Sequence, residues 1–212
     1  MSDRIELAPG LVYIPDFFDP DGQQNLIAAI QDVIRQAPLF TPRMPRTGKP
    51  FSVRMSNCGV LGWMSDAKGG YRYEPAHPQT QSPWPPIPDG VLQAWRDASG
   101  CRALPEACLI NWYDPGARMG LHQDRDEQAL DAPVVSISLG ADCLFRFGGV
   151  ERRAPTRSLR LRSGDIVVIG GAARLCFHGV DRIYPGTSQL VEGGGRINLT
   201  LRRVLPLDNR AA

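Results

Sequence analysis

The chain has 212 residues, of which 42% are hydrophobic, and its formal net charge is +2. This length suffices for a single domain, residues 1–212, with a well-formed core, and so small a charge permits a nucleic-acid partner without requiring one. The five cysteines form no C-x-x-C pair, which favours reduced thiols, and no apolar run approaches the length of a membrane span. We therefore expect a soluble, monomeric, cytoplasmic protein.

Residues 1–39 are expected to form a strand and a helix that support the rest of the chain. A short apolar stretch at 11–14 is typical of a strand. Asp19 followed by Pro20 predicts a helix start, because aspartate caps free amides and proline suits the first turn. Apolar residues then recur at helical spacing until Pro38: Leu26, Ile27, Ile30, Val33, Ile34 and Ala37.

Residues 40–88 have a different character, with many prolines, glycines, cations and aromatic rings. Up to Tyr73 the segment has one acid, Asp66, and six cations: Arg43, Arg46, Lys49, Arg54, Lys68 and Arg72. The interleaved rings are Phe51, Trp63, Tyr71, Tyr73 and Trp84. Cations attract phosphates and rings stack on bases, so the composition suits a nucleic acid. The alternative is an irregular, solvated cover over one end of the core.

From Pro88 onward the patterns predict one helix and then only short strands. The helix has Leu92, Trp95 and Ala98 at its buried positions and Gly100 as its C-cap. Strands are predicted at 107–113, 135–139, 143–147, 159–162, 165–169 and 196–202. Many short strands without intervening helices indicate a mainly β protein with flanking helices, an antiparallel sandwich or barrel. The double-sheet jelly roll is the member of that class whose interior holds a small ligand or metal.

His122 and Asp124 form a candidate metal site with His178. The first two lie two residues apart just past a Pro-Gly turn, and on an extended segment such residues point to the same side. Two histidines and one carboxylate, with the other positions open, suit non-haem Fe(II) that activates dioxygen. A hydrogen-bonded structural histidine beside a turn aspartate would give the same pattern. His77, next to a proline, is interpreted as a structural loop residue and not as a ligand.

Residues 196–202 alternate strictly between polar and apolar side chains. Arg196, Asn198, Thr200 and Arg202 fall on one face, and Ile197, Leu199 and Leu201 on the other. An ordinary surface strand would show the same pattern. Two arginines inside a small barrel would instead need anionic partners, because arginine keeps its charge. A dicarboxylic acid would supply both partners, with each guanidinium gripping one carboxylate.

Together these patterns resemble the AlkB-type Fe(II)/2-oxoglutarate dioxygenases, which repair alkylated nucleic-acid bases. The similar motifs are Asn111-x-Tyr113, His122-x-Asp124-x-Asp126, His178, the 196–202 strand, SVRMSNCG (52–59), LGW (61–63), PQT (78–80), ACLIN (107–111), FGG (147–149) and GDIVV (164–168). The resemblance covers the chain apart from its first few residues and the tail after about Leu205. It implies a double-stranded β-helix (jelly-roll, cupin-like) catalytic core at 107–205 and a nucleotide-recognition lid at 40–88.

The resemblance also implies a role for each matching residue. Fe(II) is bound by the catalytic residues His122, Asp124 and His178, and dioxygen reacts there. The 2-oxoglutarate residues are Asn111, Tyr113, Arg196, Asn198 and Arg202, with Arg196 at the distal carboxylate and Arg202 at the carboxylate near the metal. The substrate residues are Trp63, which stacks on the base, Tyr71, which contacts the nucleic-acid backbone, and Asp126, which accepts a hydrogen bond from the exocyclic amino group. Tyr73 is the alternative to Tyr71, and a surface pair with Arg125 or Arg118 is the alternative for Asp126.

The implied reaction is oxidative demethylation of N-alkylated bases such as 1-methyladenine and 3-methylcytosine. The target base must leave the stack, so single-stranded DNA is the preferred partner, with double-stranded DNA or RNA also possible. A substrate-contacting arginine of the family falls at Ser158, between Arg157 and Arg160, which leaves the contribution of this strand open. Two other hypotheses remain: an oxygenase acting on RNA, protein or a small metabolite, and a jelly-roll module that binds without turnover.

Overall fold

Two antiparallel sheets packed face to face form the centre of the computed structural model, which describes residues 3–206. The larger sheet has the order β1 (Ile5–Ala8), β2 (Leu11–Ile14), β11 (Ile166–Ile169), β8 (Val134–Gly140), β13 (Arg196–Arg202), β6 (Ala107–Tyr113) and β3 (Arg54–Gly59). The smaller sheet has the order β10 (Arg157–Leu161), β9 (Asp142–Phe147), β12 (His178–Tyr184) and β7 (Met119–His122). Apolar side chains from both sheets, such as Leu109 and Phe145, form one core between them. The prediction of a mainly β jelly roll is therefore confirmed.

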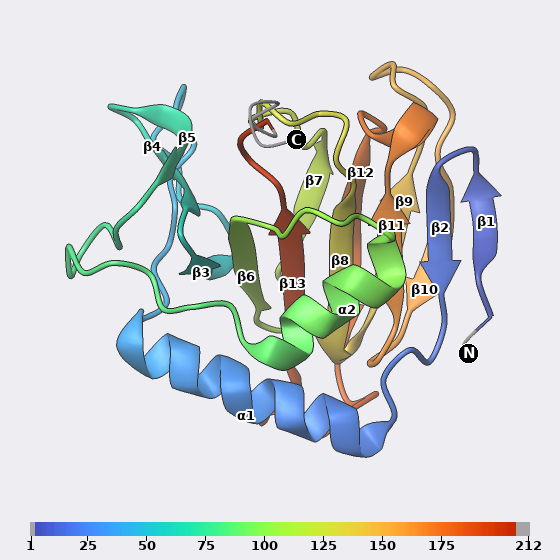
Figure 1. Ribbon diagram of the computed structural model, residues 1–212, viewed down its shortest axis with the longest axis horizontal. Coiled ribbons are helices and arrows are strands. Elements are labelled where there is room, and N and C mark those ends of the chain that lie inside the picture. Colours follow the sequence, from blue (N-terminus) through green and yellow to red (C-terminus); the bar gives the residue numbers. More distant parts are fainter. Residues whose placement is uncertain (1–2, 207–212) are drawn as a thin grey trace.

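Two helices cover the outer face of the larger sheet (Figure 1). α1 (Pro20–Gln36) begins at the Asp19 cap, whose side chain accepts a hydrogen bond from the Gly22 amide at 2.7 Å. α2 (Asp89–Ser99) ends at Gly100, which has the left-handed conformation expected of a C-cap. Both helices were predicted. The expected burial of Leu92 is wrong, since this residue is only partly buried, and Val91 and Ala94 fill the buried face of α2 beside Trp95. None of the described helices has the length and apolar character needed to cross a membrane.

Strand β13 lies in the middle of the larger sheet, and its alternation decides which side chains reach the interior. Its neighbours are β6, with Asn198 opposite Asn111, and β8, with Asn198 opposite Ser138. The apolar residues Ile197, Leu199 and Leu201 pack toward the helices. The polar residues of the other face are all buried and line a cavity between the two sheets: Arg196, Asn198, Thr200 and Arg202. The surface-strand alternative for this segment is therefore wrong.

Residues 40–88, here called the cover segment, lie at one end of the sandwich (Figure 1). This segment contains regular strands, unlike the irregular cover that was the alternative. β3 joins the larger sheet, and β4 (Gly62–Asp66) and β5 (Gly70–Glu74) form a separate hairpin. His77 is fully buried here. Its Nδ1 accepts from the amides of Gln79 and Thr80, and its Nε2 donates to the carbonyl of Pro38 at 2.8 Å. The interpretation of His77 as a structural residue is confirmed.

The strands of the core match their predictions to within one or two residues, and several additional strands are present. β10 ends at Leu161, and β11 begins at Ile166. Strands β1, β3, β4, β5, β7 and β12 were not predicted. All five cysteines are free, as expected.

Candidate metal centre and cavity

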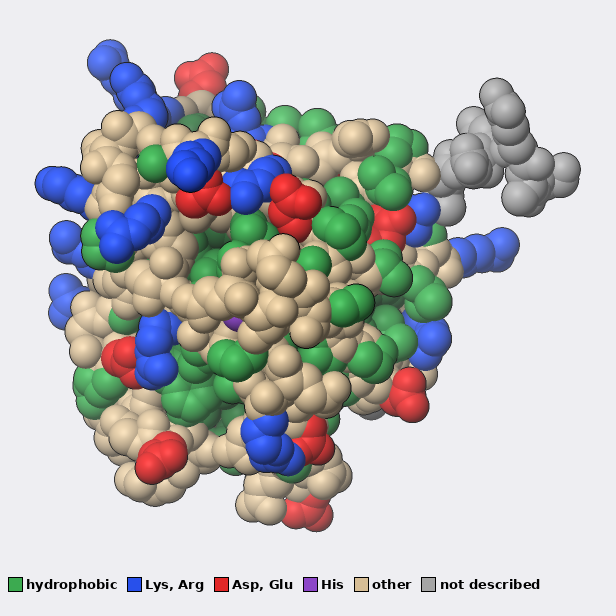
Figure 2. Space-filling model, turned by 90° about the vertical axis from the view of Figure 1, so that its left-hand side faces the viewer, with side chains coloured by type: hydrophobic (Ala, Val, Ile, Leu, Met, Phe, Trp, Pro, Cys, Tyr) green, Lys and Arg blue, Asp and Glu red, His purple; other side chains and the backbone are tan. Residues whose placement is uncertain are grey.

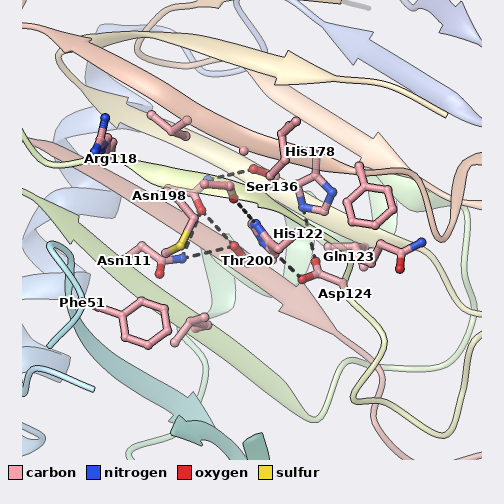
Figure 3. Close-up of a pocket in the computed structure, with 18 of the residues that line it drawn as sticks. Phe51, Asn111, Arg118, His122, Gln123, Asp124, Ser136, His178, Asn198 and Thr200 are labelled. Atoms are coloured by element: carbon pink, nitrogen blue, oxygen red, sulfur yellow. Dashed lines mark hydrogen bonds and ion pairs between the residues drawn. The ribbon is translucent and has the colours of Figure 1, made fainter. Parts of the chain in front are cut away.

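His122, Asp124 and His178 meet at one point of the cavity. His122 ends β7 and lies opposite His178, the first residue of β12, while Asp124 follows two residues after His122. The Asp124 carboxylate is 3.7 Å from Nε2 of His122 and 3.8 Å from Nε2 of His178. The three possible ligand atoms lie within 4.8 Å of one another, and Figure 3 shows both rings converging on Asp124. The pairing of β7 with β12 thus assembles the predicted triad.

The backbone orients both imidazoles with Nε2 toward this point. Nδ1 of His122 is 2.9 Å from the Gly120 carbonyl, and Nδ1 of His178 is 3.1 Å from the Cys176 carbonyl. A carbonyl oxygen only accepts hydrogen bonds, so each Nδ1 carries the proton and each Nε2 presents its lone pair. Burial, assisted by the neighbouring His122, lowers the pKa of His178 to about 4. His178 is therefore neutral at physiological pH, as a metal ligand must be.

Gly179 allows β12 to approach β7 closely beside the triad. A Cβ atom at this position would lie 2.5 Å from the carbonyl oxygen of Met119 and 2.8 Å from that of Gly120. Such distances are far inside van der Waals contact, so any larger residue would push the two strands apart. Because His178 precedes Gly179 directly, the glycine helps to set the separation of the two histidines.

The Asp124 carboxylate is buried and ionised, and only one of its two oxygens has a hydrogen-bond donor. Its Oδ1 accepts a hydrogen bond from Nη2 of Arg202 at 2.8 Å, whereas its buried Oδ2 has no hydrogen-bond partner. Burial alone would raise the pKa of Asp124, but the positive charge of Arg202 and the hydrogen bond that it donates oppose burial and help to hold that pKa well below its ordinary value. A buried anionic oxygen without a donor, facing two imidazole lone pairs, fits a divalent cation. The residues therefore fit Fe(II), with imidazole and carboxylate as its ligands.

The floor of the cavity is a connected set of hydrogen bonds between β6, β13 and β8. The Asn111 amide donates to Asn198 at 3.2 Å, Thr200 donates to the same oxygen at 2.8 Å, and Asn198 donates to Ser136 at 2.7 Å. These side chains lie beside the triad in Figure 3. Oδ1 of Asn111 is buried without a partner, so the floor keeps one free acceptor.

Arg196 carries an unpaired positive charge inside the cavity. It is 1% exposed, and its guanidinium donates to the Ser138 hydroxyl at 2.7 Å and the Ala141 carbonyl at 3.3 Å. Its Nε has no partner, and no acidic group among residues 3–206 forms an ion pair with it. A buried arginine without an anion is costly, so this position is suited to an anionic ligand. Tyr113, also buried, lies close enough for the positive charge of Arg196 to act on its hydroxyl.

Arg202 differs from Arg196, because its charge is already balanced by protein carboxylates. Besides the hydrogen bond to Asp124, its Nε lies 3.4 Å from Oε1 of Glu127, a buried acid. Nη2 of Arg174 lies 3.0 Å from the other oxygen of Glu127. Two cations and two anions therefore form one buried, charge-balanced cluster next to the metal site. Nothing in the local sequence pattern pointed to Glu127 or Arg174.

Trp63, Tyr71 and Asp126 meet at the mouth of the cavity. Nε1 of Trp63 donates to Oδ2 of Asp126 at 2.9 Å, and the ring of Tyr71 stacks on that of Trp63 with centroids 5.6 Å apart. Asp126 therefore bonds to Trp63, and its predicted alternative as a surface partner of Arg125 or Arg118 is wrong. Tyr73, the alternative to Tyr71, is half-buried and does not line the cavity.

All eleven predicted site residues line one cavity of about 1240 Å³: Trp63, Tyr71, Asn111, Tyr113, His122, Asp124, Asp126, His178, Arg196, Asn198 and Arg202. Four further cations border it: Arg118, Arg125, Arg146 and Arg152. Figure 2 shows a histidine in a recess near the centre of this face, with Lys and Arg side chains, interspersed with Asp and Glu, around it.

The arginines of strand β10 do not line the cavity, although its last residue, Leu161, does, and an arginine of the turn before the strand also lines it. Arg160 pairs with Asp142 at 2.8 Å, and Arg157 donates to the carbonyl of Leu7 at 2.8 Å. Arg152, in the preceding turn, lies 5.7 Å above the ring of Phe177, and both line the cavity. In the sequence, Arg157 and Arg160 of β10 were the candidates for the substrate-contacting arginine. Arg152 was not identified, because the sequence of a turn does not show which of its arginines faces the cavity.

The fold and the site define a metal-dependent oxygenase of the jelly-roll type, with a 2-His-1-carboxylate centre and a buried arginine that lacks an anion. Comparison with known proteins agrees. Residues 10–202 match the family model of the 2OG-Fe(II) oxygenase superfamily. The chain is 52% identical over 203 residues to an alpha-ketoglutarate-dependent dioxygenase AlkB homolog of Caulobacter vibrioides, covering 96% of this chain and 91% of that protein. It is 42% identical to the alpha-ketoglutarate-dependent dioxygenase AlkB of Escherichia coli, covering 93% of this chain and 91% of that protein.

A solved structure supports the same assignment. The structure of OsALKBH1 superposes with a TM-score of 0.82 at 31% sequence identity, covering 95% of this chain and 100% of that chain. The chain therefore belongs to the AlkB-type dioxygenases of the 2OG-Fe(II) oxygenase superfamily. It is an Fe(II)- and 2-oxoglutarate-dependent dioxygenase.

Proposed function

We propose that this enzyme removes alkyl groups oxidatively from N-alkylated bases of nucleic acid, with 1-methyladenine and 3-methylcytosine in single-stranded DNA as its preferred substrates. One observation carries the proposal: the Trp63 ring and the Asp126 carboxylate meet at the mouth of the same cavity that holds the triad. Both lesions are cationic, and a cationic base is attracted to an aromatic face and to a carboxylate. An extruded base that enters between them would point its alkyl group at the metal centre.

We assign the metal and co-substrate to the inner part of the cavity. His122, Asp124 and His178 would hold Fe(II). When bound, Fe(II) with 2-oxoglutarate supplies the oxidation by dioxygen that yields succinate and CO2 and hydroxylates the N-methyl carbon, which is lost as formaldehyde. Arg196 would bind the distal carboxylate of 2-oxoglutarate, since it is the buried cation without an anion.

The remaining residues of the inner cavity would position the co-substrate. Tyr113 and Asn198 would contact the same distal carboxylate as Arg196, and Asn111, with its free Oδ1, would complete the pocket. Arg202 would orient Asp124 and neutralise the carboxylate that lies nearest the metal. These assignments follow the charges of the described side chains. Arg196, which has no acidic partner, would take the distal carboxylate of 2-oxoglutarate, and Arg202, which is paired with Asp124, would stay beside the metal site.

The outer part of the cavity would bind the nucleotide. Trp63 would stack on the extruded base, and Asp126 would accept a hydrogen bond from its exocyclic amino group through Oδ1, which has no partner among residues 3–206. Tyr71, 52% exposed at the rim, would contact the backbone. Arg118, Arg125, Arg146 and Arg152 would attract the flanking phosphates. In this proposal the cover segment (40–88) is the nucleotide-recognition lid, 107–205 is the catalytic core and 1–39 supports them.

We further propose that the enzyme acts as a cytoplasmic monomer. A single chain supplies the three candidate metal ligands and both arginines of the cavity, which is the set that the proposed reaction requires. The five free cysteines suit a reducing compartment.

The test is reconstitution under argon with Fe(II) and 2-oxoglutarate, followed by air and a single-stranded DNA oligonucleotide that carries one 1-methyladenine. The expected result is loss of one methylene unit from the oligonucleotide by mass spectrometry, with formaldehyde released and both signals absent in Asp124→Ala. The same lesion in duplex DNA and in RNA gives the substrate preference. The RNA arm matters because a relative from Schizosaccharomyces pombe, 35% identical over 48% of this chain, is named a tRNA demethylase. If succinate forms while the methyl group stays, the substrate is of another class.

A further inference from the structure

The β4–β5 hairpin is connected to the metal-binding loop through two consecutive carboxylates. Trp63 and Tyr73 are directly paired across the hairpin, and so their side chains share one face. Trp63 donates to Asp126 at 2.9 Å, and the Tyr73 hydroxyl donates to Oε1 of Glu127. Both acceptors follow the metal-binding Asp124 within three residues of the chain. The first contact lies at the exposed mouth of the cavity, and the second joins a half-buried tyrosine to a buried carboxylate.

The contact between Tyr73 and Glu127 belongs to the buried cluster beside the metal site. The side chain of Glu127 is 1% exposed, and its two oxygens face Arg202 Nε at 3.4 Å and Arg174 Nη2 at 3.0 Å. Arg202 donates in turn to the Asp124 carboxylate at 2.8 Å, and Arg174 donates to the Asp124 carbonyl at 2.5 Å. A continuous path of polar contacts therefore runs from a hairpin hydroxyl to the metal-binding carboxylate.

We propose that Tyr73 is a positioning residue whose hydrogen bond to Glu127 couples the β4–β5 hairpin to the metal centre, so that loading the centre with metal and 2-oxoglutarate tightens the hairpin over the cavity. The inference rests on Asp124 as a metal ligand and goes beyond the proposed function, since it does not depend on which substrate the cavity accepts.

Metal loading would affect the hairpin because Arg202 contacts both the metal-binding Asp124 and the Tyr73 partner Glu127. Metal coordination at Asp124 and a co-substrate carboxylate near Arg202 restrict both side chains, and Glu127 lies between them and Tyr73. Fewer conformations of Glu127 mean a better-ordered acceptor for the Tyr73 hydroxyl, so opening the hairpin must break a stronger contact. Burial also raises the pKa of Tyr73 well above its ordinary value, which keeps the hydroxyl protonated as the donor.

Tyr71 provides a matched control on the same strand and the same face. Its ring stacks on Trp63, yet it is 52% exposed, and its hydroxyl has no hydrogen bond within the described part of the chain. Tyr71→Phe and Tyr73→Phe each remove a single oxygen atom and keep the ring. Only the second removes a contact to the cluster.

The experiment measures amide hydrogen exchange of the full-length protein in peptides that cover Gly62–Glu74. Spectra are compared with and without Mn(II) plus 2-oxoglutarate under argon, since Mn(II) suits the same ligands without turnover. In wild type and in Tyr71→Phe, loading should slow exchange of the hairpin amides by about threefold or more. In Tyr73→Phe the loaded and unloaded rates should be equal, with Mn(II) binding confirmed by calorimetry.

The ratio of loaded to unloaded rates separates coupling from a merely structural role. A structural role would speed exchange of Tyr73→Phe in both states and leave the ratio as in wild type, which would overturn the proposal. An unchanged hairpin in loaded wild type would overturn it as well. If Tyr73→Phe fails to fold, Glu127→Gln replaces it: the amide oxygen still accepts from Tyr73 but no longer attracts Arg202, and the response should again be lost. The exchange experiment contains no nucleic acid. Its result therefore does not depend on whether the enzyme demethylates nucleic acid, and the two proposals can fail separately.

Discussion

His122 and His178 lie directly opposite each other on the paired strands β7 and β12, with ring centroids 4.6 Å apart. The positions of two ligands are therefore set by the backbone pairing of a sheet. The third ligand, Asp124, is held by Arg202 from the opposite sheet. A site built in this way is formed before the metal arrives, which limits the reorganisation that binding requires.

Removal of the carboxylate ligand should weaken metal binding strongly. In Asp124→Ala the two imidazoles remain, but the anionic oxygen that lacks a donor is gone. We expect the affinity for Mn(II), measured by calorimetry under argon, to fall by at least about 100-fold, the upper end of what loss of a ligand's supporting partner costs. Asp131→Ala, an exposed acid of the same loop, is the control and should bind as wild type does. Normal binding by Asp124→Ala would remove this residue from the ligand set.

The two buried arginines should respond in opposite ways to replacement by methionine. Arg196 has no acidic partner, so Arg196→Met should leave the free energy of unfolding unchanged or raise it, while the KM for 2-oxoglutarate rises by about 10- to 100-fold. Arg202→Met leaves Asp124 and Glu127 short of a cation and should cost about 3–5 kcal/mol of stability. Urea unfolding and steady-state kinetics provide both numbers. Equal destabilisation by the two substitutions would contradict the assignment of Arg196 as the unpaired charge.

The metal-free protein should lose stability as the pH falls through the range in which His178 resists protonation. Its pKa drops from the ordinary 6.5 to about 4 on folding, because the ring is buried. Between these two values the unfolded chain binds more protons than the folded one, so stability rises with pH across this window and is lost on acidification. Thermal unfolding should therefore show a steeper fall in Tm from pH 6.5 to 4 for wild type than for His178→Asn. Identical slopes would show that His178 is not held neutral.

Substitution of Trp63 should weaken nucleic-acid binding without affecting the metal. Loss of one stacking face costs about 1–3 kcal/mol, so Trp63→Leu should raise the KM for the methylated oligonucleotide by about 5- to 150-fold. The affinity for Mn(II) should stay as in wild type, because the Trp63 ring hydrogen-bonds to the outer residue Asp126 and to none of the three metal ligands. Trp112→Leu is the matched control, since Trp112 does not line the cavity. An unchanged KM in Trp63→Leu would place the base elsewhere.

Local periodicity in the sequence determined the side of each main element that is buried. The alternation at 196–202 separated the cavity residues Arg196 and Arg202 from the helix-facing residues, and Asp19 with Pro20 marked the start of α1. Such features depend only on the geometry of a strand or a helix turn, so they are readable from neighbouring residues. The spacing of His122 and Asp124 is of the same kind. The third ligand, His178, is the one other histidine downstream of Asp124, and the resemblance of the motifs then supplied the co-substrate.

Only the tertiary structure decided which distant side chains meet. Tyr73 and Glu127, Trp63 and Asp126, and Arg152 with Phe177 are brought together by strand register and loop paths that no short stretch of sequence encodes. The same holds for the contrast between the two arginines of β13: periodicity places both inside, but their charges are balanced or unbalanced according to what β8 and the Asp124 loop present to them. The sequence by itself determined the fold class and the ligands, because these follow from residue type and periodicity. The electrostatic state of the cavity was decided by long-range packing.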